Sequence, residues 1–125
     1  MNKYHFTISI HFKSDYEVKN LENILKLKPY SVTSFENSRG KEKSAKFVYR
    51  TSTLTETYTD ELFEQFVNKV KTKLLPLPEI LKNNNGTCTF RIVFDELNEK
   101  PCLSLSNKVL AELYKLNANY DVVFN

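Results

Sequence analysis

Two histidines are the side chains of this 125-residue sequence best suited to acid–base or metal chemistry. His5 and His11 are an even number of positions apart in a segment where apolar and polar residues alternate, which places both on one face of a predicted strand. The six positions from one to the other span roughly 20 Å of extended chain, so one metal ion cannot bind both. Catalysis would need a carboxylate or hydroxyl partner that the sequence does not identify. We therefore interpret both as surface histidines on an open sheet.

Acidic residues cluster twice along the chain. Asp60, Glu61 and Glu64 fall in the opening turn of a predicted helix, where the helix dipole favours carboxylates. Asp95, Glu96 and Glu99 follow a predicted strand, in what we expect to be a loop. Their spacing does not fit an EF-hand, and the loop lacks the glycine that a tight turn around calcium requires. We expect no metal site at either cluster.

Nucleophile and cofactor motifs are missing from the sequence. Cys88 and Cys102 are 14 positions apart without a CxxC motif or a second pair, which indicates two reduced structural cysteines. No GxSxG elbow occurs, and Gly40 and Gly86, the only glycines, cannot build a loop that cradles phosphate. We expect neither a cofactor nor enzymatic activity.

The strongest charge asymmetry lies between positions 26 and 50. This stretch contains only two acidic residues, Glu36 and Glu42, and seven basic ones: Lys26, Lys28, Arg39, Lys41, Lys43, Lys46 and Arg50. It could dock an anionic partner, or it could be a solvated loop whose lysines maintain solubility. The sequence leaves both interpretations open.

The elements that would position these residues follow from hydrophobic periodicity. Alternating apolar residues predict a strand over 4–12. Ser14 and Glu17 form a capping box that predicts a helix over about 15–27, ended by Pro29. Residues 30–44 lack apolar periodicity and predict a long exposed loop, after which alternation predicts a second strand over 45–50.

The second half of the chain repeats helix and strand signals. Thr59 caps a predicted long helix that ends at Pro76, and a short helix follows through residue 81. Residues 83–86 predict a turn in which Gly86 adopts positive φ. A third strand over 87–94, a helix capped by Ser106 and a last strand over 120–124 complete the pattern.

These elements predict a single α+β domain over residues 1–125. Each strand has one apolar and one mainly polar face, so we expect a two-layer sandwich of a mainly antiparallel sheet of four or more strands with helices on one face. The expected core contains nine of the apolar residues: Phe6, Ile8, Ile10, Leu62, Phe66, Val70, Phe90, Ile92 and Val122.

Composition narrows the class of protein. Apolar residues make up 41% of the chain, which is typical of a folded domain. The formal net charge is +3, which is smaller than that of a dedicated nucleic-acid binder. No leader sequence and no run of 18 apolar residues is present. We expect a cytoplasmic protein that does not enter a membrane.

The order and spacing of several short motifs resemble those of a bacterial family, the domain of unknown function 4279. These motifs are residues 25–29, Gly40, the aromatic strand with Phe47 and Tyr49, the helix end near Pro76, residues 103–106 and the segment 116–124. The sequence departs from the family in lacking tryptophan in the second strand and in having Phe124 where tyrosine is usual. The resemblance implies a shared fold, and because the family has no established activity it implies no catalytic residue.

The open face of the predicted sheet is the best candidate for a binding surface. We expect a protein partner to contact this face and the 30–44 loop through eight residues: His5, His11, Arg39, Lys41, Lys43, Lys46, Arg50 and Arg91. An immunity-protein-like role is one form such binding could take. Electrostatic binding of nucleic acid is the alternative, although aromatic rings that could stack on bases are expected to point inward.

Overall fold

The computed structural model describes residues 2–125 and contains five strands and four helices. Their order is β1 (Lys3–Phe12), α1 (Asn20–Leu25), β2 (Ser31–Thr33), β3 (Ala45–Arg50), α2 (Asp60–Val70), α3 (Leu77–Asn83), β4 (Gly86–Glu96), α4 (Asn107–Lys115) and β5 (Ala118–Phe124).

The five strands form one open sheet in the order β2-β3-β1-β4-β5. β1 is the central strand and pairs antiparallel with both β3 and β4. β2 extends the sheet antiparallel at one edge, and β5 pairs parallel with β4 at the other. The parallel pair requires a crossover, and α4 supplies it.

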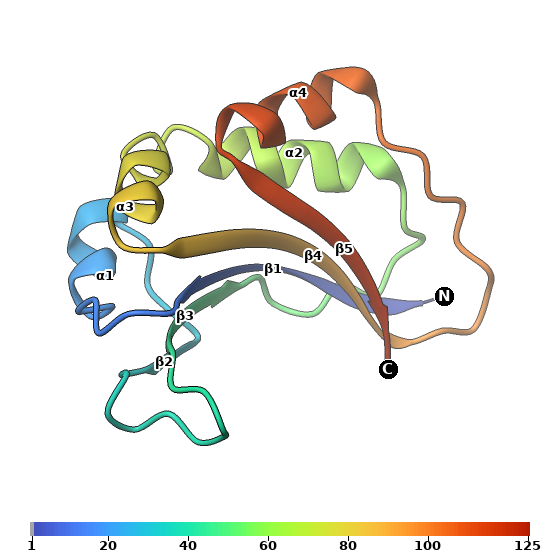
Figure 1. The fold of residues 1–125 in the computed structure, drawn as a ribbon. Coiled ribbons are helices and arrows are strands. Elements are labelled where there is room, and N and C mark those ends of the chain that lie inside the picture. The colour runs from blue at the N-terminus through green and yellow to red at the C-terminus, as the bar shows by residue number, and fades with distance from the viewer. Residues whose placement is uncertain (1) are drawn as a thin grey trace.

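The helices cover one face of this sheet, so the expected two-layer α+β fold is confirmed (Figure 1). Phe66 of α2 is the centre of an aromatic cluster beneath the helices. The centroid of its ring lies 5.3 Å from the ring centroid of Phe6 in β1, 6.0 Å from that of Phe90 in β4 and 6.3 Å from that of Tyr49 in β3. Phe63 of α2 extends the cluster toward β5. Residues from three strands therefore meet on one helix.

The first helix is shorter than its sequence pattern predicted. α1 begins after Lys19, and no side chain in the described part of the chain caps it. The predicted capping box is wrong because Ser14 Oγ donates a hydrogen bond to the carbonyl oxygen of Asn84, 2.7 Å away in the turn before β4. The helix ends at Lys26, whose φ of 54° is left-handed.

Three other boundaries differ from prediction. The predicted loop 30–44 begins with β2, which pairs with β3. α2 ends at Val70, and residues 71–76 form turns rather than further helix. β4 continues through Asp95 and Glu96, so these carboxylates lie in a strand and not in a loop.

The turn before β4 uses glycine for space rather than for positive φ. Asn85 adopts the left-handed φ of 54°, and Gly86 does not. A Cβ atom on Gly86 would lie 2.6 Å from the ring of Phe12 and 2.8 Å from Leu81. Because both neighbouring side chains are buried in the core, they have little room to move.

Most of the predicted core is confirmed, and two members lie nearer its margin. Leu62 and Val122 are only half-buried, because Leu62 lies on the flank of α2 and Val122 belongs to an edge strand. Both cysteines are free, as expected. Cys88 is buried, whereas Cys102 is exposed and has no structural role in the core.

Truncation of Phe66 tests this packing. Phe66→Ala should lower the free energy of unfolding by about 3–5 kcal/mol, because it removes the ring that joins three strands and leaves a cavity. Leu75→Ala is the control, since that side chain is 72% exposed in the turns after α2. Equal denaturation midpoints for the two variants in urea would contradict the core assignment.

Candidate functional site

The face of the sheet without helices carries mostly polar side chains, arranged in rows that run across the strands. The strand registers place Arg50, Thr7, Arg91 and Asp121 side by side across β3, β1, β4 and β5. The next two rows across the strands are Val48, Ser9, Thr89 and Asn119, and then Lys46, His11 and Thr87. Thr7 on the central strand is thus flanked by two longer cationic side chains, whereas His11 has a lysine on one side only.

Arg50 and Arg91 lie on either side of Thr7, roughly 10 Å apart at the backbone, since each strand step is 4.7–4.9 Å. The Arg50 guanidinium lies over the ring of Tyr30, 4.8 Å from its centroid, and Nη2 donates to Thr53 Oγ1 at 3.3 Å. Arg91 Nε donates to Asp121 Oδ2 at 3.3 Å. Between the two arginines, Thr7 is buried although its side chain faces away from the helices.

The loop between β2 and β3 adds more positive charge beside this face. Arg39, Lys41 and Lys43 are all exposed there. Gly40 has a φ of 125°, which favours glycine at the loop tip. Within residues 2–125 none of these three cations forms an ion pair with a carboxylate.

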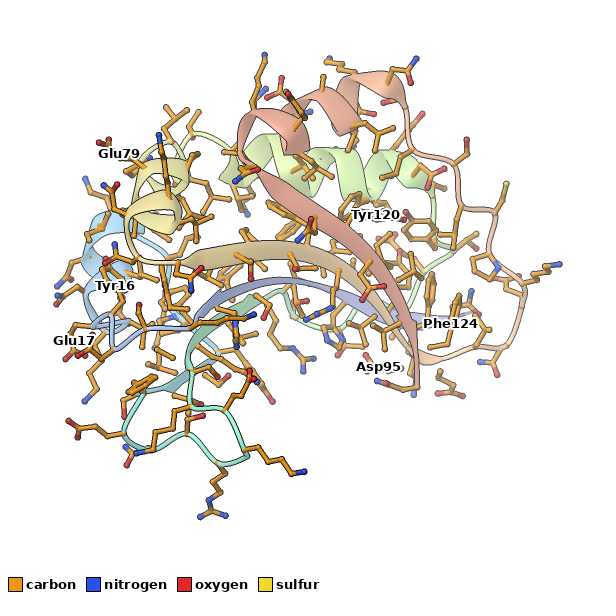
Figure 2. All side chains as sticks on the ribbon, in the orientation of Figure 1. Tyr16, Glu17, Glu79, Asp95, Tyr120 and Phe124 are labelled. Carbon is orange, nitrogen blue, oxygen red and sulfur yellow. The ribbon has the colours of Figure 1, made fainter. Side chains whose placement is uncertain are left out.

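His5 differs from the surface histidine that the sequence predicted. It is 6% exposed, and its Nδ1 lies 2.6 Å from Asp95 Oδ2. Asn125 Nδ2 donates to the other carboxylate oxygen at 3.3 Å. Figure 2 shows Asp95 on the side of the sheet away from the helices, and Tyr120 between β5 and α2. His5 therefore binds its own chain and is poorly placed to contact a partner.

Sequence reasoning missed Asp95 because it ended the strand at residue 94. Asp95 continues the alternation of Thr89, Arg91 and Val93 by one step, which puts it on the face that carries His5. Tyr30 was missed as well, because residues 30–44 were predicted to be loop. In the structure it directly precedes β2, and its N–H donates to the carbonyl oxygen of Val48.

His11 lies at the other end of the same face and is half-buried. Burial lowers its pKa from the ordinary value, and the ammonium groups of Lys46 and Lys13 lower that pKa further. At neutral pH His11 is therefore uncharged, and the positive charge around it belongs to the lysines.

Among residues 2–125, no three histidine, cysteine or carboxylate side chains are grouped so that they could hold a metal ion. Within the same range, no helix is long and apolar enough to cross a lipid bilayer.

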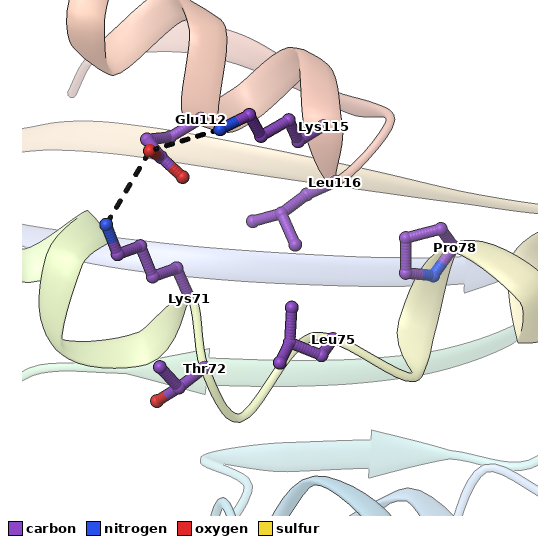
Figure 3. A pocket seen from close by; sticks show the side chains of 7 residues that line it. All are labelled: Lys71, Thr72, Leu75, Pro78, Glu112, Lys115 and Leu116. Carbon is purple, nitrogen blue, oxygen red and sulfur yellow. Dashed lines mark ion pairs between the residues drawn. The ribbon is translucent and has the colours of Figure 1, made fainter.

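A hollow of about 320 Å³ lies on the helical side, between the end of α2, α3 and α4 (Figure 3). Leu75 and Leu116 give it an apolar lining. At its rim, Glu112 Oε1 lies 3.6 Å from Lys71 Nζ and 3.8 Å from Lys115 Nζ. The single carboxylate of Glu112 is shared by the two ammonium groups, and through Lys71 it connects the end of α2 to α4.

Loss of the Asp95 carboxylate should destabilise the fold. Asp95→Ala should lower the free energy of unfolding by about 1–3 kcal/mol, because it leaves the buried His5 ring without its hydrogen-bond partner. Glu96→Ala is the matched control, since that carboxylate pairs with Lys3 in solvent. Urea denaturation that gives both variants the same stability would show that the His5–Asp95 contact contributes nothing.

The electrostatic setting of His11 can be measured directly. In an NMR titration of its ring protons, Lys46→Met should raise the pKa of His11, whereas Lys82→Met on α3 should not. Because the pKa of His11 is lower in the folded chain, the unfolded chain takes up a proton on this ring at higher pH. The free energy of unfolding therefore falls as the pH drops below about 6.5. An unchanged titration in Lys46→Met would contradict the proximity of the two side chains.

The comparisons with known proteins agree with the resemblance seen in the sequence. Residues 2–124 match the family described as domain of unknown function (DUF4279). No curated protein and no solved structure matches the chain. Because the match covers the chain from β1 to β5, the chain belongs to the DUF4279 family.

Proposed function

We propose that the protein is a non-catalytic binding module that recognises an acidic surface of another protein. The binding site would be the basic surface, which we define as Arg39, Lys41, Lys43, Lys46, Arg50 and Arg91. The observation that carries the proposal is that five of these six cations form no ion pair within residues 2–125, the exception being Arg91. Cations that lie together without carboxylate partners favour an anionic partner.

The kinds of side chain present favour a protein over RNA. Tyrosine and arginine are enriched among the residues that dominate protein–protein binding energy, and Tyr30 and Arg50 are already stacked here. RNA binding on an open sheet usually needs several exposed rings on the strands themselves. The outward positions of β1, β3, β4 and β5 carry no phenylalanine, tyrosine or tryptophan. Of the histidines there, His5 is buried and His11 half-buried, and one face of the Tyr30 ring is covered by Arg50.

The lack of catalysis is part of the proposal. The His5–Asp95 pair resembles part of a catalytic dyad, but the imidazole is almost fully buried and no hydroxyl or thiol among residues 2–125 is hydrogen-bonded to it. A pair in that position stabilises the sheet more readily than it activates a substrate. Immunity proteins, which neutralise toxins by binding them, are one class of small protein that works without catalytic groups, and the analogy is one of mode alone.

Charge reversal on the basic surface tests the proposal. The wild-type chain should capture one protein in stoichiometric amount from its native cell extract, and the purified partner should bind in calorimetry. Changing Lys41, Lys43, Lys46 and Arg50 to Glu should abolish that binding, because the variant repels an acidic surface. Changing Lys19, Lys69, Lys82 and Lys108 to Glu gives the same net charge on the helical side and should leave binding intact.

Salt and nuclease treatment distinguish the partner class. A protein complex with a packed centre should lose much less affinity as salt rises than a complex with nucleic acid, which should weaken steeply and be destroyed by nuclease. Recovery of nucleic acid would show that the partner is a nucleic acid and not a protein. Equal loss of binding in both charge-reversed variants would show that net charge, not this surface, is responsible.

A further inference from the structure

The two edges of the sheet differ in how they are protected. β2 has only three residues and follows Pro29 closely, which makes it a poor template for another strand. β5 has seven residues with no proline, no lysine and no break in its register with β4. In Figure 1, β5 crosses in front of the other strands, and the segment that leads to α4 passes beyond the end of the sheet. The β5 edge is therefore long and open.

The backbone groups that β5 offers at this edge can be identified. The N–H of Asn125 donates to the carbonyl oxygen of Phe94, so Asn125 faces inward to β4. Because backbone groups alternate in direction along a strand, the N–H and C=O groups of Tyr120, Val122 and Phe124 face outward. No strand within residues 2–125 pairs with them.

An apolar flank of α4 lies beside the same edge. Glu112 faces α2 through its ion pair with Lys71. Successive helix residues are about 100° apart, so Leu110 and Tyr114 lie on the opposite flank, away from α2 and on the outer side of β5. Leu110 is 44% exposed and Tyr114 86% exposed. Phe124 of β5 is also exposed, by 53%.

We infer that β5 is a dimerisation edge, on which β5 of a second copy of this chain pairs antiparallel about a two-fold axis. A second copy fits because one axis satisfies both features at once. It pairs the outward backbone groups with one another, and it brings Leu110 and Tyr114 of one copy against the same flank of the other. An unrelated strand would satisfy the backbone groups but would leave the α4 flank uncovered.

Charge selects the register of the two strands. An axis at Asp121 would place two carboxylates opposite each other, which is unfavourable. An axis at Val122 places Asp121 opposite Val123 of the second copy and Tyr120 opposite its Phe124. Aromatic pairs of this kind stabilise antiparallel strands. In this register Val122 lies opposite its own copy, with Cα atoms about 5.5 Å apart.

Sedimentation of the full chain tests the inference. The wild type should have twice the mass of one chain at concentrations in the micromolar range. The double variant Leu110→Glu/Tyr114→Glu should sediment as a monomer with an unchanged circular dichroism spectrum, since both side chains are exposed. The control Leu75→Glu/Tyr30→Glu has the same substitutions at exposed sites elsewhere and should remain dimeric. A monomeric wild type, or a dimer that persists in the first variant, would overturn the inference.

A disulfide tests the register. In a Cys102→Ser background, Val122→Cys should cross-link two copies under mild oxidation, because the predicted spacing suits a disulfide. Cys88 should not interfere, since it is fully buried and burial raises the pKa of its thiol to about 12. Tyr30→Cys in the same background should not cross-link. Failure of Val122→Cys to cross-link would overturn the proposed pairing, even if a dimer forms. These outcomes do not depend on the basic surface, so they can be separated from the proposed function.

Discussion

The alternation of side chains along β1 is the constraint on which the rest of the structure depends. Tyr4, Phe6, Ile8, Ile10 and Phe12 all point into the core and are at most 2% exposed. The residues between them point to the face that has no helices. Because β1 is paired on both sides, a shift of one residue would expose all five apolar side chains and break two ladders. The core and the open face are thus fixed together.

Pairing on both sides of β1 also explains the character of the open face. Its central strand carries polar side chains, and two of them are buried although no helix lies over them. Thr7 is flanked by Arg50 and Arg91, and His5 is hydrogen-bonded to Asp95. Charge is therefore carried by the flanking strands, with Arg50 on one side and Arg91 on the other. A partner would meet a basic rim around a small, polar centre.

Features that depend on neighbouring residues could be predicted from the sequence. Contacts between residues far apart in the chain, and a strand of only three residues, could not. Alternation identified four of the five strands and the residues of the open face, since that signal needs only neighbouring positions. The partner of His5 lies 90 residues away, and nothing local indicates it. The hydrogen bond from Ser14 to Asn84, which replaces the predicted helix cap, was missed for the same reason, because the two residues are 70 positions apart. Residues 31–33 are too few to show a period.

Sheet geometry connects the open edge to the basic surface. A two-fold axis through an antiparallel edge pair runs perpendicular to the sheet, so both copies keep their open faces on the same side. Two basic surfaces would then face one direction, with β5 and its copy between them. A partner with two acidic patches at a matching distance would be bound at both, and the second contact would form at high effective concentration. Binding to such a partner would therefore weaken when the β5 edge is disrupted, even though no residue of the basic surface is changed.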